Sequence, residues 1–372
     1  MSKRIGVVTG GGDCPGLNAV IRAVAKTSAN HGWECIGVLG GYEGLLEPRR
    51  TIPLDYQRLS GLLPRGGTIL GTANRGKFSA KVGHGETRAF PKELLEDVKA
   101  GMEALDFFAL VAVGGDGSLS IAQQLFEHGI PVVGVPKTID NDLEGTLFTF
   151  GFDSAVACAT DALDRLHTTA ESHNRVMVLE VMGRYAGWIA LTAGVAGGAD
   201  VILIPEIPFS YESVFAKIRE REELGKKFTI VVVAEGARQK DGNFTEVGSA
   251  RCAGRTPQRG FPTQPSEARL GGIGAVVSAE IEKGTGKESR ACVLGHLQRG
   301  GSPTTFDRAL CSIFGAMAVE LIAAGEFGKM VAFTGSQVGA IKISDAVGKL
   351  KTVRPDGNLV RTARALGISF GD

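Results

Sequence analysis

Residues 107–129 read FFALVAVGGDGSLSIAQQLFEHG, and the character of the chain changes twice along this stretch. The run Phe107–Val113 is continuously apolar, which predicts a strand buried on both faces, as in a parallel sheet. A glycine-rich turn follows it. The amphipathic pattern of Ser118–His128, closed by Gly129, then predicts a helix. A buried strand, a tight turn and a helix form the repeating unit of a doubly wound α/β protein.

The same unit recurs along the chain. Helical patterns cover Leu17–Asn30, Ser154–His173 and Arg184–Ala196. Further strands are predicted at Arg4–Thr9, Glu34–Leu39, Pro131–Val135, Arg175–Val181, Val201–Ile204, Phe228–Ala234, Arg290–Leu294 and Lys329–Thr334. So many strands in 372 residues exceed one ordinary core, so we expect two lobes with mainly parallel sheets. Ligands of such sheets bind at the carboxyl ends of the strands.

Composition excludes several classes of function. The net charge of +1 gives no overall field that would attract nucleic acid or a membrane surface. The 6 cysteines show no C-x-x-C pair and no zinc-binding spacing. We find no signal-peptide pattern and no apolar run near the ~20 residues that span a bilayer, so we expect a cytoplasmic protein. The 53 glycines are about twice the usual share of ~7%, which favours turns that closely approach a bound anion.

Two glycine-rich turns follow predicted strands, at Gly10–Gly12 and at Gly114–Gly117. Backbone N–H groups of such turns, with the positive end of the next helix, bind phosphate groups. Ser118 is predicted to cap its helix. Asp116 beside a polyphosphate requires a divalent cation between them, which predicts Mg2+. Neither turn has the G-x-G-x-x-G or G-x-x-x-x-G-K-[ST] spacing, and the Gly-Gly-Asp-Gly-Ser pattern favours another kind of nucleotide-dependent kinase.

A third turn, Pro136–Asp142, reads PKTIDND after the predicted strand Pro131–Val135. Two carboxylates one residue apart at a strand end would normally repel each other. One of them can act as a general base while the other orients a metal ion or the backbone. Phosphoryl transfer to an alcohol needs such a base near the acceptor hydroxyl and cations that spread the charge of the transferred group.

Together these motifs resemble the 6-phosphofructokinase family. Gly-Gly-Asp-Gly-Ser is followed about twenty residues later by Pro-Lys-Thr-Ile-Asp-Asn-Asp, as in that family. Three later stretches agree: MGRYAG at 182–187, AEG at 234–236 and LGHLQRGGSP at 294–303. The motifs run in the family's order from residue 5 to about residue 310, and they are most similar to the mixed-substrate branch, which resembles both ATP-dependent and pyrophosphate-dependent enzymes.

The resemblance implies an architecture and a reaction. It implies two doubly wound, Rossmann-like α/β lobes with mainly parallel sheets and the active site in the cleft between them. Residues 1–151 with 298–348 would bind the nucleotide, and residues 152–297 with 349–372 would bind fructose 6-phosphate. The enzyme would be a glycolytic transferase, a Mg2+-dependent kinase that moves a phosphoryl group from ATP to the 1-hydroxyl of D-fructose 6-phosphate. It would be a cytoplasmic homo-oligomer, a tetramer or a dimer.

The resemblance also implies the roles of single residues. Asp140 corresponds to the catalytic base, Arg184 to the arginine that stabilises charge during transfer, and Thr138 lies beside the transferred group. Asp116 corresponds to the Mg2+-associated carboxylate. The nucleotide-binding set is Gly12, Tyr42, Asn74, Arg75, Asp116, Gly117 and Ser118. The sugar-phosphate set is Thr138, Ile139, Asp140, Arg175, Met182, Gly183, Arg184, Glu235, Arg290, His296, Leu297, Gln298 and Arg299. In the family Arg175 and Arg290 come from a neighbouring subunit, so active sites are shared.

Two residues bear on the phosphoryl donor. Gly117 leaves room for the α-phosphate of a nucleotide, as in ATP-dependent members, whereas Lys137 is typical of pyrophosphate-dependent members. Steric exclusion is the harder constraint, which favours ATP. Asn74 and Arg75 replace the Arg-Phe pair of the bacterial ATP enzymes. The alternatives are a reversible pyrophosphate-dependent enzyme and a non-catalytic sugar-phosphate-binding regulatory subunit, although the latter would be expected to lack Asp140 or Asp116.

Overall fold

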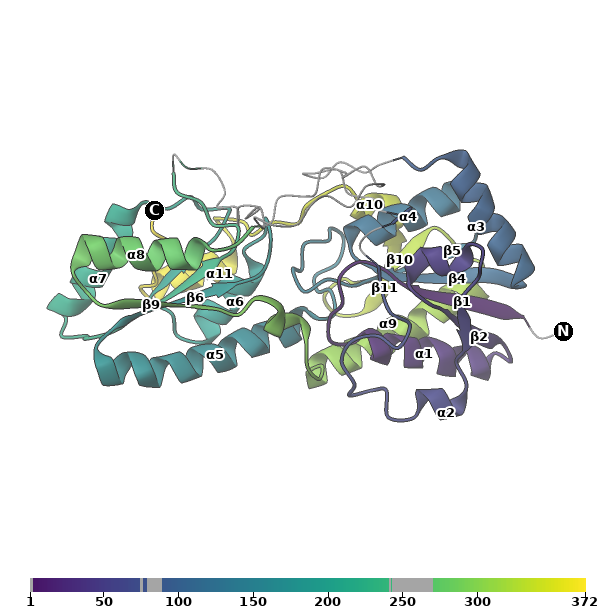
Figure 1. Ribbon diagram of the computed structural model, residues 1–372, viewed down its shortest axis with the longest axis horizontal. Coiled ribbons are helices and arrows are strands. Elements are labelled where there is room, and N and C mark those ends of the chain that lie inside the picture. Colours follow the sequence, from purple (N-terminus) through teal and green to yellow (C-terminus); the bar gives the residue numbers. More distant parts are fainter. Residues whose placement is uncertain (1–2, 74–75, 79–88, 241, 243–269) are drawn as a thin grey trace, which may run out of the picture. The chain divides into compact units, whose positions relative to one another are not determined.

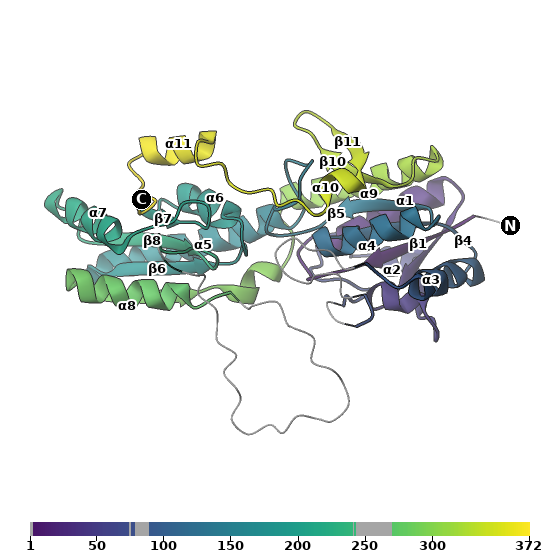
Figure 2. The ribbon, with the colours of Figure 1, turned by 90° about the horizontal axis from the view of Figure 1, so that it is seen from above.

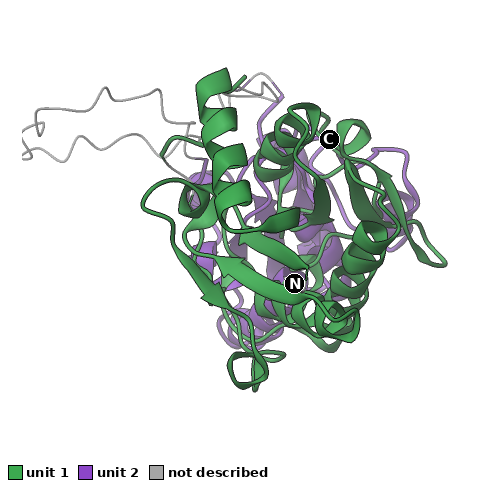
Figure 3. Cartoon of the chain, turned by 90° about the vertical axis from the view of Figure 1, so that its right-hand side faces the viewer, with its two compact units in different colours: residues 1–154, 299–351 green, residues 155–298, 352–372 purple. Residues whose placement is uncertain are grey.

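The structure is a computed structural model, and it describes residues 3–73, 76–78, 89–240, 242 and 270–372. The chain divides into two compact units. Unit 1 comprises Met1–Ser154 and Arg299–Lys351, and unit 2 comprises Ala155–Gln298 and Thr352–Asp372 (Figure 3). Which substrate each unit binds stays a prediction.

A seven-stranded sheet forms the centre of unit 1, in the order β11-β10-β5-β4-β1-β2-β3. Its strands are β1 (Arg4–Thr9), β2 (Glu34–Val38), β3 (Thr51–Pro53), β4 (Phe107–Gly114), β5 (Val132–Pro136), β10 (Lys329–Phe333) and β11 (Val338–Lys342). The five inner strands are parallel, and β3 and β11 join the two edges antiparallel. β4 is buried along nearly its whole length, which explains why its sequence is continuously apolar.

Helices cover both faces of this sheet, as Figure 1 shows. They are α1 (Leu17–Asn30), α2 (Tyr56–Leu59), α3 (Lys92–Ala104), α4 (Asp116–Glu127), α9 (Thr305–Ala323) and α10 (Ile343–Ala346), with a 3-10 helix η1 at Gly41–Leu45. α1 packs along α9 on one face. On the other face, α3, α4 and α10 bury Val98, Leu119, Leu125 and Ile343 in one apolar core.

Unit 2 contains a four-stranded parallel sheet in the order β7-β8-β6-β9. Its strands are β6 (Val176–Val181), β7 (Val201–Leu203), β8 (Thr229–Ala234) and β9 (Ser289–Val293). Its helices are α6 (Trp188–Ala196), α7 (Tyr211–Glu223), α8 (Ile273–Thr285) and α11 (Asn358–Ala365). α5 (Phe152–His173) enters this unit from unit 1, and a 3-10 helix η2 covers Gly295–Arg299. α7 and α8 pack on one face of the sheet, and α6 lies beside α11 on the other (Figure 2).

The structure confirms an α/β protein with two mainly parallel sheets, and it corrects three local predictions. The edge strands β3 and β11 were not predicted, because they are short and only partly buried. The helix predicted from Arg184 begins at Trp188, since Gly183 and Arg184 adopt positive φ angles of 139° and 52°. Helix α4 begins at Asp116 with Gly115 as its N-cap, so Ser118 lies within the first turn and does not cap it. No helix in the described part of the chain is long and apolar enough to cross a membrane.

Candidate active site

The two glycine turns of unit 1 leave neighbouring parallel strands. β1 pairs with β4 up to Thr9 and Val113, and Gly10 N donates to the Val113 carbonyl at 2.9 Å. Ser118 fills the space between the turns, since a Cβ on Gly10 would lie 2.5 Å from its Oγ, and a Cβ on Gly114 would collide with its Cβ. A larger residue at either position would displace the Ser118 side chain. The backbone of both turns is therefore held at one edge of the sheet, as a phosphate cradle requires.

Two cations lie against the first turn. The Lys137 side chain is buried, and its Nζ donates to the Gly12 carbonyl. Burial lowers the pKa of Lys137, and the nearby Arg299 lowers it further. Arg299 Nη1 donates to the Asp13 carbonyl at 3.2 Å, so this sugar-phosphate candidate contacts the turn assigned to the donor. The two positive charges favour an anion at this turn.

Three further residues predicted to bind the phosphoryl donor lie around the second turn, Gly114–Gly117. Tyr42 is buried, its hydroxyl donates to the Ser118 carbonyl at 2.9 Å, and burial raises its pKa. It therefore supports the first turn of α4 from inside the core. Asp116 Oδ1 accepts from Gly348 N at 2.8 Å, and Gly117 is partly exposed beside it in α4. Asn74 and Arg75 lie outside the described residues.

The third turn carries Asp140 beside the second. Lys137 N donates to the Gly114 carbonyl at 2.9 Å, which joins the two turns through their backbones. Asp140 is 4% exposed, and its Oδ1 has no hydrogen-bond partner among the described residues. A buried polar atom left unpaired costs about 1–3 kcal/mol, so such atoms mark strain or a function. Thr138 Oγ1 accepts from Asp140 N at 3.1 Å, and Ile139 is fully buried.

Hydrogen bonds that the sequence did not predict hold this third turn. Asn141 adopts a left-handed conformation with a φ of 51°. Its Oδ1 accepts from Thr149 N at 3.1 Å, and Thr149 Oγ1 donates to the Thr138 carbonyl at 2.7 Å. Lys351 Nζ donates to the same Asn141 Oδ1 at 2.9 Å. Asparagine is a frequent left-handed residue, so the Asp-Asn-Asp pattern was a signal for Asn141, whereas no sequence signal marks Lys351.

Unit 2 gathers a second group of candidates at the carboxyl ends of β6 and β8. These strands are parallel neighbours that end at Val181 and Ala234, so Met182 and Glu235 follow side by side. A Glu235 carboxylate oxygen accepts from Arg184 N at 3.0 Å, and Gln298 Oε1 accepts from Met182 N at 3.4 Å. Glu206, which the sequence analysis missed, accepts from Gly187 N at 3.0 Å and from Val353 N at 2.8 Å. The turn that carries Arg184 is thus held by side-chain oxygens.

Arg175 and Arg290 lie at the opposite end of the same sheet. Arg175 directly precedes β6. Arg290 lies in β9 and pairs with Met177 of β6. At ~3.3 Å per residue, both positions are roughly 20 Å along the strands from Met182. Glu288 joins the two arginines, with ion pairs of 2.7 Å to Arg175 and 2.5 Å to Arg290. Arg175 lowers the pKa of this carboxyl. Within one chain, the structure does not bring these arginines to the Arg184 turn.

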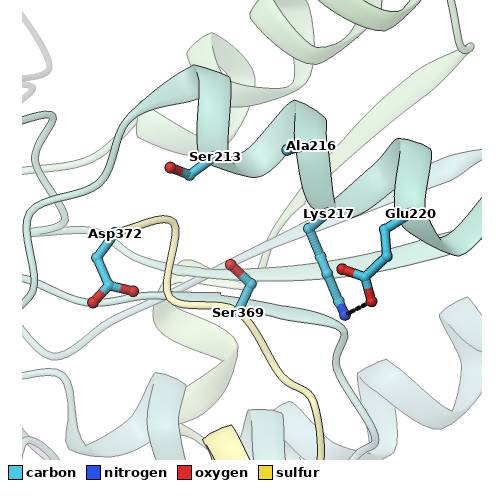
Figure 4. A pocket seen from close by; sticks show the side chains of 6 residues that line it. All are labelled: Ser213, Ala216, Lys217, Glu220, Ser369 and Asp372. Carbon is cyan, nitrogen blue, oxygen red and sulfur yellow. Dashed lines mark hydrogen bonds and ion pairs between the residues drawn. The ribbon is translucent and has the colours of Figure 1, made fainter.

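The remaining candidate residues lie on the 3-10 helix η2. His296 and Leu297 are exposed on η2, whereas Gln298 is buried. Figure 4 shows the hollow on unit 2, which contains none of the candidate residues. It is lined by Ser213, Ala216, Lys217, Glu220, Ser369 and Asp372. Its lysine is paired with its glutamate at 2.8 Å, so it offers no free cation to a ligand.

Comparison with known proteins identifies the family. The family model described as Phosphofructokinase matches residues 4–322. The chain is 53% identical over 370 residues to an ATP-dependent 6-phosphofructokinase of Chloroflexus aurantiacus, covering 100% of this chain and 98% of that protein. It is 48% identical over 356 residues to a pyrophosphate–fructose 6-phosphate 1-phosphotransferase of Amycolatopsis methanolica, covering 95% of this chain and 97% of that protein.

A solved structure agrees with this match. The Pichia pastoris phosphofructokinase in the T-state superposes with a TM-score of 0.79 and 29% identity over 93% of this chain. This chain spans 35% of that longer chain. The match of the family model over most of the sequence, together with these identities, shows that the chain belongs to the phosphofructokinase family.

Proposed function

We propose that the chain is an ATP-dependent 6-phosphofructokinase, a kinase that phosphorylates the 1-hydroxyl of fructose 6-phosphate in glycolysis and yields fructose 1,6-bisphosphate. The observation that carries this proposal is Asp140. Its buried carboxylate keeps one oxygen without a hydrogen-bond partner among the described residues, in a turn joined to a glycine cradle that suits phosphate groups. The name of the Chloroflexus aurantiacus relative supports ATP as the donor.

The chemistry follows from the side chains. Asp140 accepts the proton of the sugar 1-hydroxyl as its oxygen attacks the terminal phosphoryl group. Arg184 stabilises the charge that develops during transfer, and Thr138 positions the transferred group. The glycine turns bind the donor phosphates through backbone N–H groups. Glu235, Arg299 and the exposed His296 bind the sugar phosphate.

Magnesium fits the donor turn. Within the described residues, no group of three or more metal-ligating side chains is present. Mg2+ commonly takes one or two carboxylates and completes its shell with water and substrate phosphates, so the partly exposed carboxylate of Asp116 beside a phosphate cradle suits it. The ion would neutralise charge on the donor phosphates. Asp116 is the residue that we assign to it.

A second candidate donor is pyrophosphate. Lys137 is buried and its Nζ donates to the Gly12 carbonyl inside the donor turn, where it adds a compact positive charge for a small polyanionic donor. A relative named for pyrophosphate is 48% identical to this chain. The deciding assay supplies the purified protein with fructose 6-phosphate and Mg2+, and with ATP or pyrophosphate in separate reactions. Turnover with ATP alone supports our proposal, and turnover with pyrophosphate alone overturns the choice of donor.

We also infer a cytoplasmic homo-oligomer, a tetramer, with shared active sites. Arg175 and Arg290 lie far from Arg184 in their own chain, so their proposed contact with the 6-phosphate requires a second subunit. The edge strand β9 supports this inference, because Val293 is 54% exposed there and Val276 on the adjacent α8 is 44% exposed. Exposed apolar groups beside an open sheet edge are typical of an interface.

Mixed oligomers test the shared site. Arg290→Ala should raise KM for fructose 6-phosphate much more than KM for the donor, because a charge-assisted phosphate contact is lost. Combining Arg290→Ala with Asp140→Asn subunits should restore part of the activity, since some sites in the hybrid receive both intact groups. Native mass spectrometry verifies that hybrids form. Hybrids that form and stay inactive would show that the arginine acts within its own subunit or not at all.

A further inference from the structure

The last residue of unit 1 makes an unusual set of contacts with the segment that follows Asp140. Lys351 Nζ donates to Asn141 Oδ1 at 2.9 Å, to the Thr146 carbonyl at 2.8 Å and to the Leu147 carbonyl at 3.0 Å. An ammonium group has three N–H donors, and each of them has an acceptor here. All the N–H donors of this ammonium group are therefore used within the protein, and the lysine does not serve as a phosphate ligand.

The backbone around Lys351 is joined to the same segment. Lys351 N donates to the Asp142 carbonyl at 2.9 Å, and Leu350 forms an antiparallel bridge with Leu143. Side chain and backbone together hold both sides of the loop from Asp142 to Leu147. The Asn141 amide also donates to the Leu147 carbonyl at 3.2 Å, so Lys351 closes a ring of hydrogen bonds around this loop.

Burial lowers the pKa of Lys351, and the neighbouring carboxylates partly offset this effect. The carboxylates of Asp142 and Glu144 attract the Lys351 ammonium group, while burial disfavours its charge and brings its pKa to about 8. A neutral side chain of the same length would leave two carbonyls and the Asn141 oxygen without this donor. Asn141 follows Asp140 directly and is in the left-handed region, so the contacts of its side chain bear on the backbone that carries Asp140.

We propose that Lys351 is a positioning residue for Asp140, because its ammonium group fixes Asn141 and Leu147 and thereby sets the direction of the Asp140 carboxylate. The proposal rests on the proposed function, in which Asp140 is the general base. Lys351 touches neither substrate. It acts on the proton transfer through the turn and leaves binding of the sugar phosphate to other residues.

A double-mutant cycle tests the proposal in the full-length enzyme. Lys351→Met keeps the length of the side chain and removes its donors. We expect kcat to fall ~10–100-fold, because displacing a reacting group by about 1 Å costs up to ~100-fold, with KM for fructose 6-phosphate changed less than about threefold. In an Asp140→Asn background the same change should lower the residual kcat by less than about threefold, since the group it positions is already lost.

Matched controls separate positioning from general stability. Lys349→Met removes a lysine two residues earlier that is exposed and makes no hydrogen bond or ion pair among the described residues, so it should match the wild type. Lys351→Arg keeps a cation with several donors and should recover at least part of the kcat that Lys351→Met loses. Thermal unfolding verifies that each variant is folded. If Lys351→Met does not fold, Lys351→Gln enters the same cycle.

The outcomes are distinct. A wild-type kcat for Lys351→Met overturns the proposal. So does a fall in kcat that is equally large in the Asp140→Asn background, because the lysine would then act on structure at large and not through Asp140. Retention of activity by Asp140→Asn alone would instead overturn the part of the proposed function that makes Asp140 the general base.

Discussion

The turns that carry Asp140 and Arg184 have similar backbones, but side chains of opposite charge hold them in place. Each follows a buried parallel strand, and each contains a residue other than glycine in the left-handed region, with φ of 51° at Asn141 and 52° at Arg184. The Asp140 turn bears carboxylates, and the ammonium group of Lys351 donates to the Asn141 side-chain oxygen in this turn. The Arg184 turn bears a guanidinium group, and the carboxylates of Glu235 and Glu206 accept hydrogen bonds from its backbone.

The difference shows how a fold can hold a charged group at a strand end. The supporting side chain has the charge opposite to that of the supported one, and it binds the turn's backbone or amide groups. An ion pair with Lys351 would neutralise the charge that Asp140 needs as the proposed base. One Asp140 oxygen accordingly keeps no hydrogen-bond partner in the described part of the chain.

Removal of the Asp140 charge should give the largest effect. Asp140→Asn keeps the shape of the turn but cannot accept the proton, so kcat should fall ~10²–10⁴-fold while binding of fructose 6-phosphate persists. Steady-state kinetics and calorimetric titration of the sugar phosphate measure the two quantities. A loss of less than tenfold in kcat would show that Asp140 is not the base.

Loss of the Glu206 hydrogen bonds that hold the Arg184 turn should have a smaller effect. Glu206→Ala removes the acceptor of Gly187 N and Val353 N, and we expect kcat/KM for fructose 6-phosphate to fall by about tenfold with a loss of ~1–3 kcal/mol in the free energy of unfolding. Glu206→Gln is the matched control, because its amide oxygen can still accept both bonds. If Glu206→Gln is as impaired as Glu206→Ala, the turn needs the charge and not only the acceptor.

The side chains that hold the two turns should also differ in their response to pH, and this effect on kcat should be the smallest of those predicted. The Lys351 pKa falls from 10.5 to about 8 on burial, so the unfolded chain binds more protons between these values, and the titration of Lys351 makes the protein more stable as pH rises through that window. The neutral amine has one donor fewer, however, so kcat should fall by about twofold to fivefold above pH 8. Lys351→Arg stays charged there and should lack this decline. Identical alkaline profiles for the two proteins would contradict the assignment.

The sequence predicted the buried parts of the fold well, for a physical reason. β4 and β5 are covered on both faces, so their residues are continuously apolar and the strand ends fall where glycine or proline begins a turn. The edge strand β11 is partly exposed along most of its length and carries a weaker signal. Ser118 was wrongly predicted as a cap, because the helix begins within the glycine-rich turn, at Asp116, where the local pattern gives no helical signal.

The candidate site divides in the same way. Motifs within one turn, such as Pro136–Asp142, can be recognised because all their residues are adjacent in sequence. Lys351 could not be predicted, since its acceptors lie 204 to 210 positions earlier in the chain. Supports of this kind depend on how strands are ordered in a sheet, and a single turn motif does not specify that order.

Glu288 has a consequence for the ligands that Arg175 and Arg290 can accept. Its carboxylate already serves as a shared counter-ion for two guanidinium groups that would otherwise repel each other. An incoming anion must therefore exchange with a monovalent carboxylate that the protein supplies at high effective concentration. A monoanion gains little from this exchange, whereas a phosphate dianion brings twice the charge and can bind both groups bidentately. If Arg175 and Arg290 bind a ligand as we propose, Glu288 should therefore favour doubly charged ligands over singly charged ones.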